Sequence, residues 1–438
     1  MDKKKQGSIY ELDGVVPLTQ AIPLGIQHVL AMFLGNISPL LIIAGLIDMP
    51  LETKTVLIQN SMFIAGAATL IQLYPVWKVG AGLPIVMGTS SGFIGTSSAI
   101  GVQYGYGTVM GASLIGGLVQ MVLGFFIQPL KKLFPNVVTS LVIISIGLSL
   151  LPVGVKYFGG GVSSADFGSP KHLLVATIVV LVIVILQQFS GSFLSISSIL
   201  IGIIVGYITS ICLGMVDFTQ VKEAAWFSLP KPMVYKYEFN LNAIIAMLIM
   251  YIATTVETIG NVAGIASGGL NREATDKELS GGVIGDGFGS VLASLFSVMP
   301  NTCFGQNVGL VVVTKVVNRF AIMTGAVFLI LMGFIPKLSA LFSVMPQSVL
   351  GGAAVIMFSM IFVSGLRSLL REKIDDRNGL IIALSLGLGV GIGNVPEVVA
   401  QLPSWVGQIF AENGIITTFV VASVLNLVLP KREEKAIK

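Results

Sequence analysis

Charged residues are scarce in this chain. Of its 438 residues only 11% are charged, whereas 54% are hydrophobic, and the mean hydropathy is +0.92. A soluble domain carries about 25% charged residues. The composition therefore excludes a soluble enzyme, a secreted domain and a protein with a nucleic-acid partner. It predicts an all-α polytopic membrane protein in contact with a lipid bilayer.

Cysteine and histidine are also rare. Cys212 and Cys303 both lie in apolar segments, so we expect two small buried hydrophobic residues and no disulfide. His28 and His172 are far apart in the sequence and too few for most zinc sites. No nucleophile–base pair is visible either, so we expect no metal, no cofactor and no enzymatic reaction. We expect His172, at the outer end of a span, to be inert.

Apolar segments long enough to cross a membrane fill most of the chain. A spanning helix needs about 20 apolar residues. We expect fourteen spans, at 20–46, 53–74, 79–101, 106–129, 136–153, 171–189, 193–215, 240–266, 281–298, 301–316, 320–341, 347–366, 378–396 and 414–430. Residues 1–19 lack an apolar run directly after their lysines, so they are expected to form a cytosolic tail and not a signal peptide.

The basic residues support this topology. With the N-terminus inside, 18 of the 25 Lys and Arg residues fall in cytosolic segments and seven in outer ones. Such an excess on the cytosolic side predicts that both termini are cytosolic, including a tail at 431–438. We expect the longer outer stretches, which contain Trp226 and Trp405, to be loops with interfacial anchors.

Two pairs of segments indicate an internal repeat. Met87–Phe93, MGTSSGF, matches Phe304–Leu310, FGQNVGL, at an offset of 217 residues with both G-x-x-x-G spacings aligned. Phe134–Gly147 resembles Met345–Phe358 at an offset of 211. Because each repeat would hold seven spans, an odd number, the two repeats would be inverted. Chance similarity between glycine-rich apolar segments is the alternative for either pair alone.

The segment Pro300–Lys315, PNTCFGQNVGLVVVTK, is a poor spanning helix because proline, glycine and amides interrupt it. A half-helix that begins inside the membrane has free N-terminal N–H groups that can face a polar ligand. Irregular backbone at this depth occurs only where it is buried in protein or lines a cavity. Broken segments in both repeats are the best sequence indication of a transporter's binding site. We therefore expect a polar site at this segment.

Glu257 is the most conspicuous ionisable residue within a span, where such groups are costly and usually functional. Helical spacing places Thr254, Glu257, Asn261 and Gly264 on one face, which we expect to point into the protein. Glu257 could accept hydrogen bonds from ring N–H groups and take up a proton. A structural carboxylate satisfied by its neighbours is the alternative.

Other polar residues have weaker assignments. Asp286, in GGVIGDGFGS, is expected to support the structure or the coupling more than to touch ligand. His28, beside Gln27, is expected to be a hydrogen-bonded partner of the site. Ser90 and Ser91 either cap a half-helix or contact substrate, and Lys315 either anchors the topology or serves the site.

The stretch QNVGLVVVTK resembles the signature of the nucleobase–ascorbate transporter family, Q/E/P-N-x-G-x-x-x-x-T-R/K/G. The matching positions are Gln306, Asn307, Gly309, Thr314 and Lys315. The Glu257 segment, the GDG around Asp286, the Gln27-His28 pair and the fourteen spans agree with it. The resemblance covers nearly the whole chain.

This resemblance implies two inverted seven-span repeats, with a short strand before a half-helix in the third and tenth spans. It implies a core domain at 20–130 and 239–342 and a gate domain at 131–238 and 343–430. Members are typically homodimers in the plasma membrane with an elevator-like motion, and most bacterial ones are coupled to protons.

The resemblance also implies site roles. Glu257 and Gln306 would bond the base, with backbone near Phe304 and Gly305, and Asn307 would support the site. Glutamine at position 306 resembles the pattern of the xanthine and urate carriers. Ser91 stands where uracil-type relatives have an aromatic residue, which leaves room for a bicyclic base. Asn261 cannot titrate, which argues against a proton relay through it.

The sequence therefore predicts import of an oxidised purine, xanthine or urate, by proton symport. A uracil carrier of the same fold is the alternative. A channel or anion exchanger on the same plan would favour a basic residue at the broken helices, and the third and tenth spans hold none before Lys315.

Overall fold

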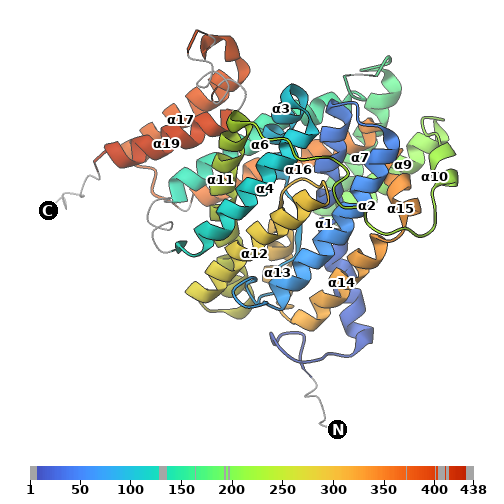
Figure 1. Ribbon diagram of the computed structural model, residues 1–438, viewed down its shortest axis with the longest axis horizontal. Coiled ribbons are helices and arrows are strands. Elements are labelled where there is room, and N and C mark those ends of the chain that lie inside the picture. The colour runs from blue at the N-terminus through green and yellow to red at the C-terminus, as the bar shows by residue number, and fades with distance from the viewer. Residues whose placement is uncertain are drawn as a thin grey trace. The chain divides into compact units, whose positions relative to one another are not determined.

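A computed structural model describes residues 7–430 except 128–135, 163, 192–193, 196–197, 371, 400, 403–409 and 411–413. It consists mostly of helices, with one two-stranded sheet in the described residues (Figure 1). The predictions made for residues 1–6, for Trp405 and for the tail at 431–438 lie outside the described residues.

The first half of the chain, up to residue 223, contains a strand followed by a short helix between longer helices. Its elements are α1 (Leu18–Leu46), α2 (Leu51–Leu73), β1 (Met87–Thr89), η1 (Ser91–Phe93), α3 (Ile94–Tyr104), α4 (Tyr106–Gly124), α6 (Asn136–Phe158), α7 (Pro170–Phe189), α9 (Ser198–Cys212) and α10 (Thr219–Glu223).

The second half follows a similar order. Its elements are α11 (Leu241–Leu270), α12 (Asp276–Leu295), β2 (Asn301–Cys303), α13 (Gly305–Thr314), α14 (Arg319–Met332), α15 (Pro336–Ser343), α16 (Gln347–Leu369), α17 (Asp376–Asn394), η2 (Pro396–Val399) and α19 (Gly414–Val428).

The chain divides into two compact units. The first holds Met1–Gln128 and Val153–Ile356, and the second holds Pro129–Pro152 and Met357–Lys438. In the first unit α4 packs along α12, and α14 packs against α1 and α2 (Figure 1). In the second unit α17 packs along α19, and buried apolar residues such as Leu141, Ile381 and Ala422 form a core.

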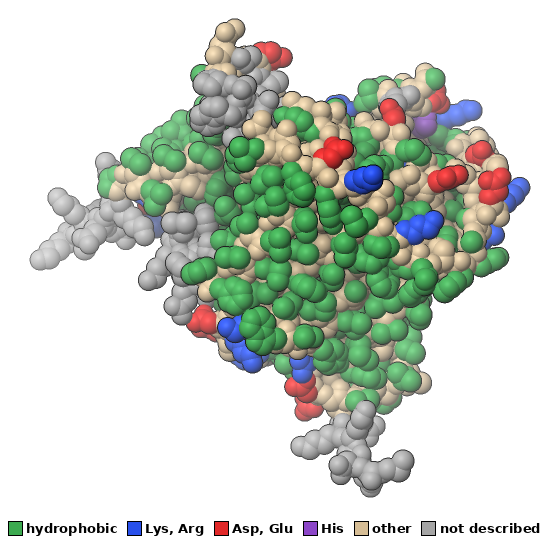
Figure 2. Space-filling model, in the orientation of Figure 1, with side chains coloured by type: hydrophobic (Ala, Val, Ile, Leu, Met, Phe, Trp, Pro, Cys, Tyr) green, Lys and Arg blue, Asp and Glu red, His purple; other side chains and the backbone are tan. Residues whose placement is uncertain are grey.

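Seven helices in the described residues are long and apolar enough to cross a membrane. These are α1, α2, α4, α6, α7, α11 and α16; α14 and α15, bent by 82° at their junction, would make an eighth. The face of the first unit seen in Figure 2 agrees with a membrane setting, since hydrophobic side chains cover its middle and charged ones gather toward two margins. The chain is a multi-pass membrane protein, and the number fourteen stays a prediction.

Elements of the same type occur in both halves of the chain at the two pairs of segments that the sequence match identified. Helices α6 and α16 both have 23 residues and begin 211 residues apart, as the sequence match predicted. The strands, however, begin 214 residues apart, and so do the helical turns that follow them at Ser91 and Gly305. The sequence match at an offset of 217 therefore differs by three residues from the offset of the elements, because it aligned glycines of different elements. In the order of the elements, the counterparts of Ser90 and Ser91 are Phe304 and Gly305.

Strands β1 and β2 form an antiparallel pair in which Met87, Gly88 and Thr89 face Cys303, Thr302 and Asn301. Two further backbone bonds extend the pair beyond its ends. The N–H of Ser90 donates to the carbonyl of Pro300 at 2.8 Å, and the N–H of Phe304 donates to that of Val86 at 2.9 Å. Both strands expected from the family resemblance are present, and each satisfies the backbone groups of the other.

Helix α1 packs closely against β1. A Cβ built on Gly88 would lie 2.6 Å from the Phe304 ring and 2.9 Å from the Asn36 side-chain oxygen. That oxygen accepts bonds from the N–H and the hydroxyl of Thr89, at 2.8 and 3.0 Å. Glycine at position 88 thus permits the helix to approach, and Asn36 bonds the outer edge of the strand.

Asp286 joins four elements of the first unit. Its Oδ2 accepts a bond from Thr258 of α11 at 2.6 Å, from Gln120 of α4 at 2.9 Å and from Thr302 of β2 at 3.5 Å. Asp286, Gln120 and Thr258 are almost completely buried. A buried polar group that loses its partner is costly, so this cluster holds α4, α11, α12 and β2 in one arrangement.

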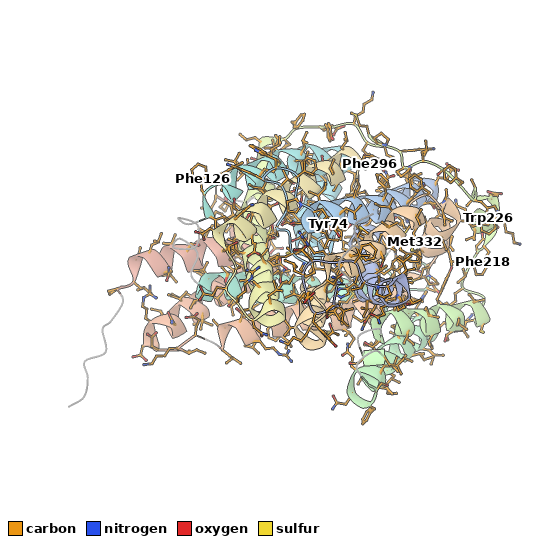
Figure 3. The ribbon with its side chains drawn as sticks, turned by 90° about the horizontal axis from the view of Figure 1, so that it is seen from below. Tyr74, Phe126, Phe218, Trp226, Phe296 and Met332 are labelled. Atoms are coloured by element: carbon orange, nitrogen blue, oxygen red, sulfur yellow. The ribbon has the colours of Figure 1, made fainter. Side chains whose placement is uncertain are left out.

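The N-terminal segment packs against the turn between α13 and α14. The side-chain amide of Asn318 donates to the carbonyls of Ser8, Glu11 and Gly14 at 3.1 to 3.4 Å, and Asn318 also caps α14. Arg319 forms an ion pair with Asp13 and lies over the ring of Tyr74, which is labelled in Figure 3. Residues 8–14 are thus part of the folded first unit.

His172, which was expected to be inert, and Cys212, which was expected to be buried, differ from these expectations in the structure. His172 is buried, and its ring nitrogens contact Asp166 at 3.0 Å and Ser348 at 3.2 Å, so it connects α7, the preceding loop and α16. Bonds from Ser164 and His172 lower the pKa of Asp166 to about 2.

Cys212 is exposed, because it ends α9 on a side that also exposes Ile208; Cys303 is buried as expected. Trp226, labelled in Figure 3, is exposed as an interfacial anchor would be.

We expect Thr258→Val to destabilise the protein, because it removes the shortest hydrogen bond to Asp286. Loss of one such bond costs roughly 1–3 kcal/mol. The measurement is the thermal unfolding midpoint of the purified protein in detergent. Thr255→Val is the matched control: this hydroxyl is equally buried on α11 but bonds only to the carbonyl of Tyr251 in its own helix. Equal midpoints for the two variants would contradict the role of Asp286 as a junction.

We expect Asn318→Ala to release the N-terminal segment, since the change removes three donor contacts and the cap of α14. Loss of a helix cap alone costs about 1 kcal/mol. Limited proteolysis followed by mass spectrometry should show faster cleavage within residues 8–17 than in the wild type. Asn394→Ala, which affects an exposed amide bonded within its own helix, should leave the cleavage rate unchanged. A segment that stays protected in Asn318→Ala would disprove the contact.

Candidate functional site

The first turn of α13 is open on one side. Gly305, Gln306 and Gly309 are exposed, whereas Asn307 and Leu310 on the other side are buried. A Cβ on Gly309 would have nothing within 4 Å. In the described part of the chain no acceptor is found for the N–H groups of Gly305 and Gln306, as is usual for the first turn of a helix. These groups can bind a polar ligand.

Helix α11 runs alongside α13 in the same direction. A Cβ on Gly264 would lie 3.0 Å from Val308, and one on Gly268 would lie 2.4 Å from Val312. The two contacts are four residues apart on both helices, so Gly264 packs against Val308 and Gly268 packs against Val312. This packing fixes how the Glu257 end of α11 meets the start of α13.

Asn261 fixes α11 to β2. Its side-chain amide donates to the carbonyl of Cys303 at 3.2 Å, and a Cβ on Gly305 would lie 3.5 Å from its side-chain oxygen. Glu257 lies one helical turn before Asn261 and is half-buried. Its neighbour Thr258 bonds Asp286, so two bonds to other elements fix α11 within four residues after the carboxylate.

Glu257 and Gln306 share one property. Within the part of the chain that the structure describes, neither side chain has a hydrogen-bond partner. Thr254, expected on the same face as Glu257, is buried, and its hydroxyl bonds the carbonyl of Tyr251 in its own helix. The unbonded carboxylate on α11 offers acceptors to a ligand, and the unbonded amide and N–H groups on the first turn of α13 offer donors.

His28 and Asn307 bond one another. The Asn307 amide donates to the carbonyl of His28 at 2.9 Å and lies 3.2 Å from its Nδ1. Both residues are buried, at 2% and 1% exposure, so they lie behind the open side of α13 and not on it. The pair joins α1 to α13.

The serines of the first half differ from the expectation of capping. Ser90 is buried and precedes η1, but its side chain makes no capping bond; its N–H donates to Pro300. Ser91 is half-buried at the start of η1. Phe304, the counterpart of Ser90, is buried, and its ring lies against Gly35 and Gly88. Its backbone, and not its ring, adjoins the open side of α13.

Lys315 ends α13 in a left-handed conformation with φ of 59°, and its Nζ donates to the carbonyl of Gly268 near the end of α11. Lys315 therefore joins the ends of the two parallel helices, beyond any role as a topological anchor. It lies more than two helical turns from Gln306 along α13.

The sequence did not reveal the amides and hydroxyls that hold the site elements. Asn36 accepts a bond from β1, and the side chain of Gln72 bonds Ala81 and Gly282. Three further side chains donate to Asp286: Gln120, Thr258 and Thr302. A signal was available for some of them, since a buried polar side chain in an apolar helix needs a partner. Which partner it has depends on how distant helices pack.

Comparison with known proteins agrees with the signature. The sequence profile of the permease family matches residues 19–398. A xanthine permease of Bacillus subtilis is 37% identical, with 93% of both chains covered. A uric acid permease of the same organism is 35% identical, with 94% of this chain and 93% of that one covered. These matches confirm the expectation of a transporter rather than an enzyme.

A solved structure shares the fold. The murine Solute Carrier 26 family member A9 anion transporter in the inward-facing state superposes with a TM-score of 0.65, covering 94% of this chain and 68% of that one. The identity is 13%, so this likeness concerns the fold alone. Taken with the family profile over residues 19–398, the relatives show that the chain belongs to the permease family, the nucleobase–ascorbate transporters whose signature it carries.

Proposed function

We propose that this protein imports an oxidised purine, xanthine or urate, together with a proton. The observation that carries the proposal is that Glu257, one helical turn before Asn261, and Gln306, on the open first turn of α13, have no hydrogen-bond partner in the described part of the chain. The two relatives named for xanthine and uric acid support the choice of substrate. The substrate would lie between the half-helices that follow β1 and β2, with Ser90 and Ser91 on the first-half side.

The chemistry of recognition suits a purine dione. Its rings alternate N–H donors with carbonyl acceptors on one flat edge. An ionised Glu257 only accepts hydrogen bonds, whereas Gln306 and the N–H groups of Gly305 and Gln306 supply donors. A site of polar groups discriminates strongly, because a wrong ligand leaves one of them unpaired. In this proposal His28, Asn307, Asn261, Thr254 and Asp286 orient the groups that touch substrate.

We infer the larger architecture from the repeated order of elements. Antiparallel strands from corresponding positions of the two halves are what two inverted seven-span repeats would place side by side. On this plan, spans 1–4 and 8–11 form the core at 20–130 and 239–342. The gate takes 131–238 and 343–430. The core would move past the gate in an elevator-like cycle, in a homodimer in the plasma membrane with both termini cytosolic.

A uracil carrier of the same fold is the second candidate, because the same pair of polar groups could bond a single ring. A binding panel of xanthine, urate, uracil, guanine and hypoxanthine on the purified protein decides between them. An anion exchanger or channel is disfavoured, since the half-helices have no basic side chain before Lys315. Currents without saturable uptake would reverse that choice.

We expect Glu257→Gln to lower xanthine uptake at least tenfold and to remove its dependence on external pH, because an amide cannot take up a proton. Radiolabelled uptake, in cells lacking their own carriers, at several pH values measures both effects. Glu397→Gln, which makes the same change at an exposed position of η2, should behave like the wild type. Full uptake by Glu257→Gln, with the pH dependence of the wild type, would refute the proposed role of Glu257.

We expect Gln306→Glu to change substrate preference, since it replaces a group with both donors and acceptors by one that only accepts. Loss of one matched bond at a buried polar site changes selectivity by tenfold or more. Competition of labelled xanthine uptake by unlabelled uracil and urate measures the preference. Gln20→Glu, in the exposed first turn of α1, is the control. Unchanged ratios in Gln306→Glu would show that this side chain does not touch the ring.

A further inference from the structure

Of three regularly spaced glycines on α11, two pack against valines of α13 and the third, Gly260, packs against no side chain. Gly268 meets Val312, and Gly264 meets Val308. The next position in this series pairs Gly260 with Phe304, but nothing lies within 4 Å of a Cβ built on Gly260. The reason is the ring of Phe304, which turns away to lie against Gly35 and Gly88.

The space beside Gly260 is held open by its neighbours. Asn261, the next residue, is bonded to the carbonyl of Cys303, and Thr258, two residues before, is bonded to Asp286. These bonds keep α11 from moving toward β2 to fill the space. Glu257 precedes Gly260 by three residues and thus lies about one helical turn away on nearly the same face.

Neither packing nor backbone conformation explains glycine at this position. Gly264 and Gly268 are required by a close valine, and Gly80 or Gly161 by a positive φ, but Gly260 has neither requirement. Glycine in a helix interior lowers stability relative to alanine. At position 260 it leaves open space between the carboxylate of Glu257 and the amide of Asn261, in which a ligand can lie.

Building on the proposed function, we propose that Gly260 is a substrate-contact residue: the flat ring of the substrate lies against its backbone, in the space where Phe304 provides no side chain. A Cβ at position 260 would occupy part of this space. The ring would then lie between the N-terminal turn of α13 and Gly260, with its polar edge toward Glu257 and Gln306.

The test is Gly260→Ala in the full-length purified protein. We expect xanthine to bind about tenfold or more weakly, as one extra methyl group in a close-fitting pocket does. The unfolding midpoint without ligand should equal or exceed that of the wild type, since alanine is the better helix former. Calorimetry measures the binding and a thermal scan the stability.

Gly387→Ala is the matched control. Gly387 also lies in a helix interior, is exposed and has nothing within 4 Å of a Cβ, but it belongs to α17 in the second unit. It should bind xanthine as the wild type does.

The outcomes separate two failures. A wild type that binds no member of the nucleobase panel refutes the proposed function, and the role of Gly260 with it. A wild type that binds xanthine, with Gly260→Ala binding equally well, overturns only the role of Gly260. A lower unfolding midpoint of Gly260→Ala also overturns it, because the space would then be filled by the protein itself.

Discussion

The pairing of β1 with β2 is the interaction on which the rest of the first unit depends. A helix that begins within a bilayer leaves backbone groups that water cannot reach, and each unsatisfied group costs several kcal/mol. Here the extended residues before both half-helices satisfy each other, from Val86 with Phe304 to Ser90 with Pro300. This pairing satisfies the backbone before both half-helices and leaves the unbonded N–H groups of Gly305 and Gln306 at the open start of α13.

The sequence predicted those parts of the structure that depend on composition and local pattern. The breaks in the third and tenth segments, the α6–α16 match and the face of α11 with Glu257 and Asn261 all follow from residue type and spacing. The signature at Gln306 led to the correct family. The open first turn of α13 appears in the structure where Gly305, Gln306 and Gly309 interrupt an apolar run.

What the sequence could not provide depends on contacts between distant segments. Glycine spacing aligned the two halves of the chain three residues away from the offset of their strands, because a glycine can serve a strand, a turn or a helix contact. The partners of Asp286 come from three other elements, and no local pattern relates Gln120 to Thr302. For His172, a position at the outer end of a span led to the expectation of an inert residue, but its ring nitrogens contact Asp166 and Ser348.

The N-terminal segment has a consequence for the order of folding. Its carbonyls at Ser8, Glu11 and Gly14 are bonded by Asn318, more than 300 residues later in the chain. During synthesis these residues emerge long before Asn318, so the three carbonyls lack this partner until the turn before α14 has been made. Closing so long a loop is entropically costly and follows the local helices. We therefore expect the N-terminal segment to dock on Asn318 only after the residues of both strands have been synthesised.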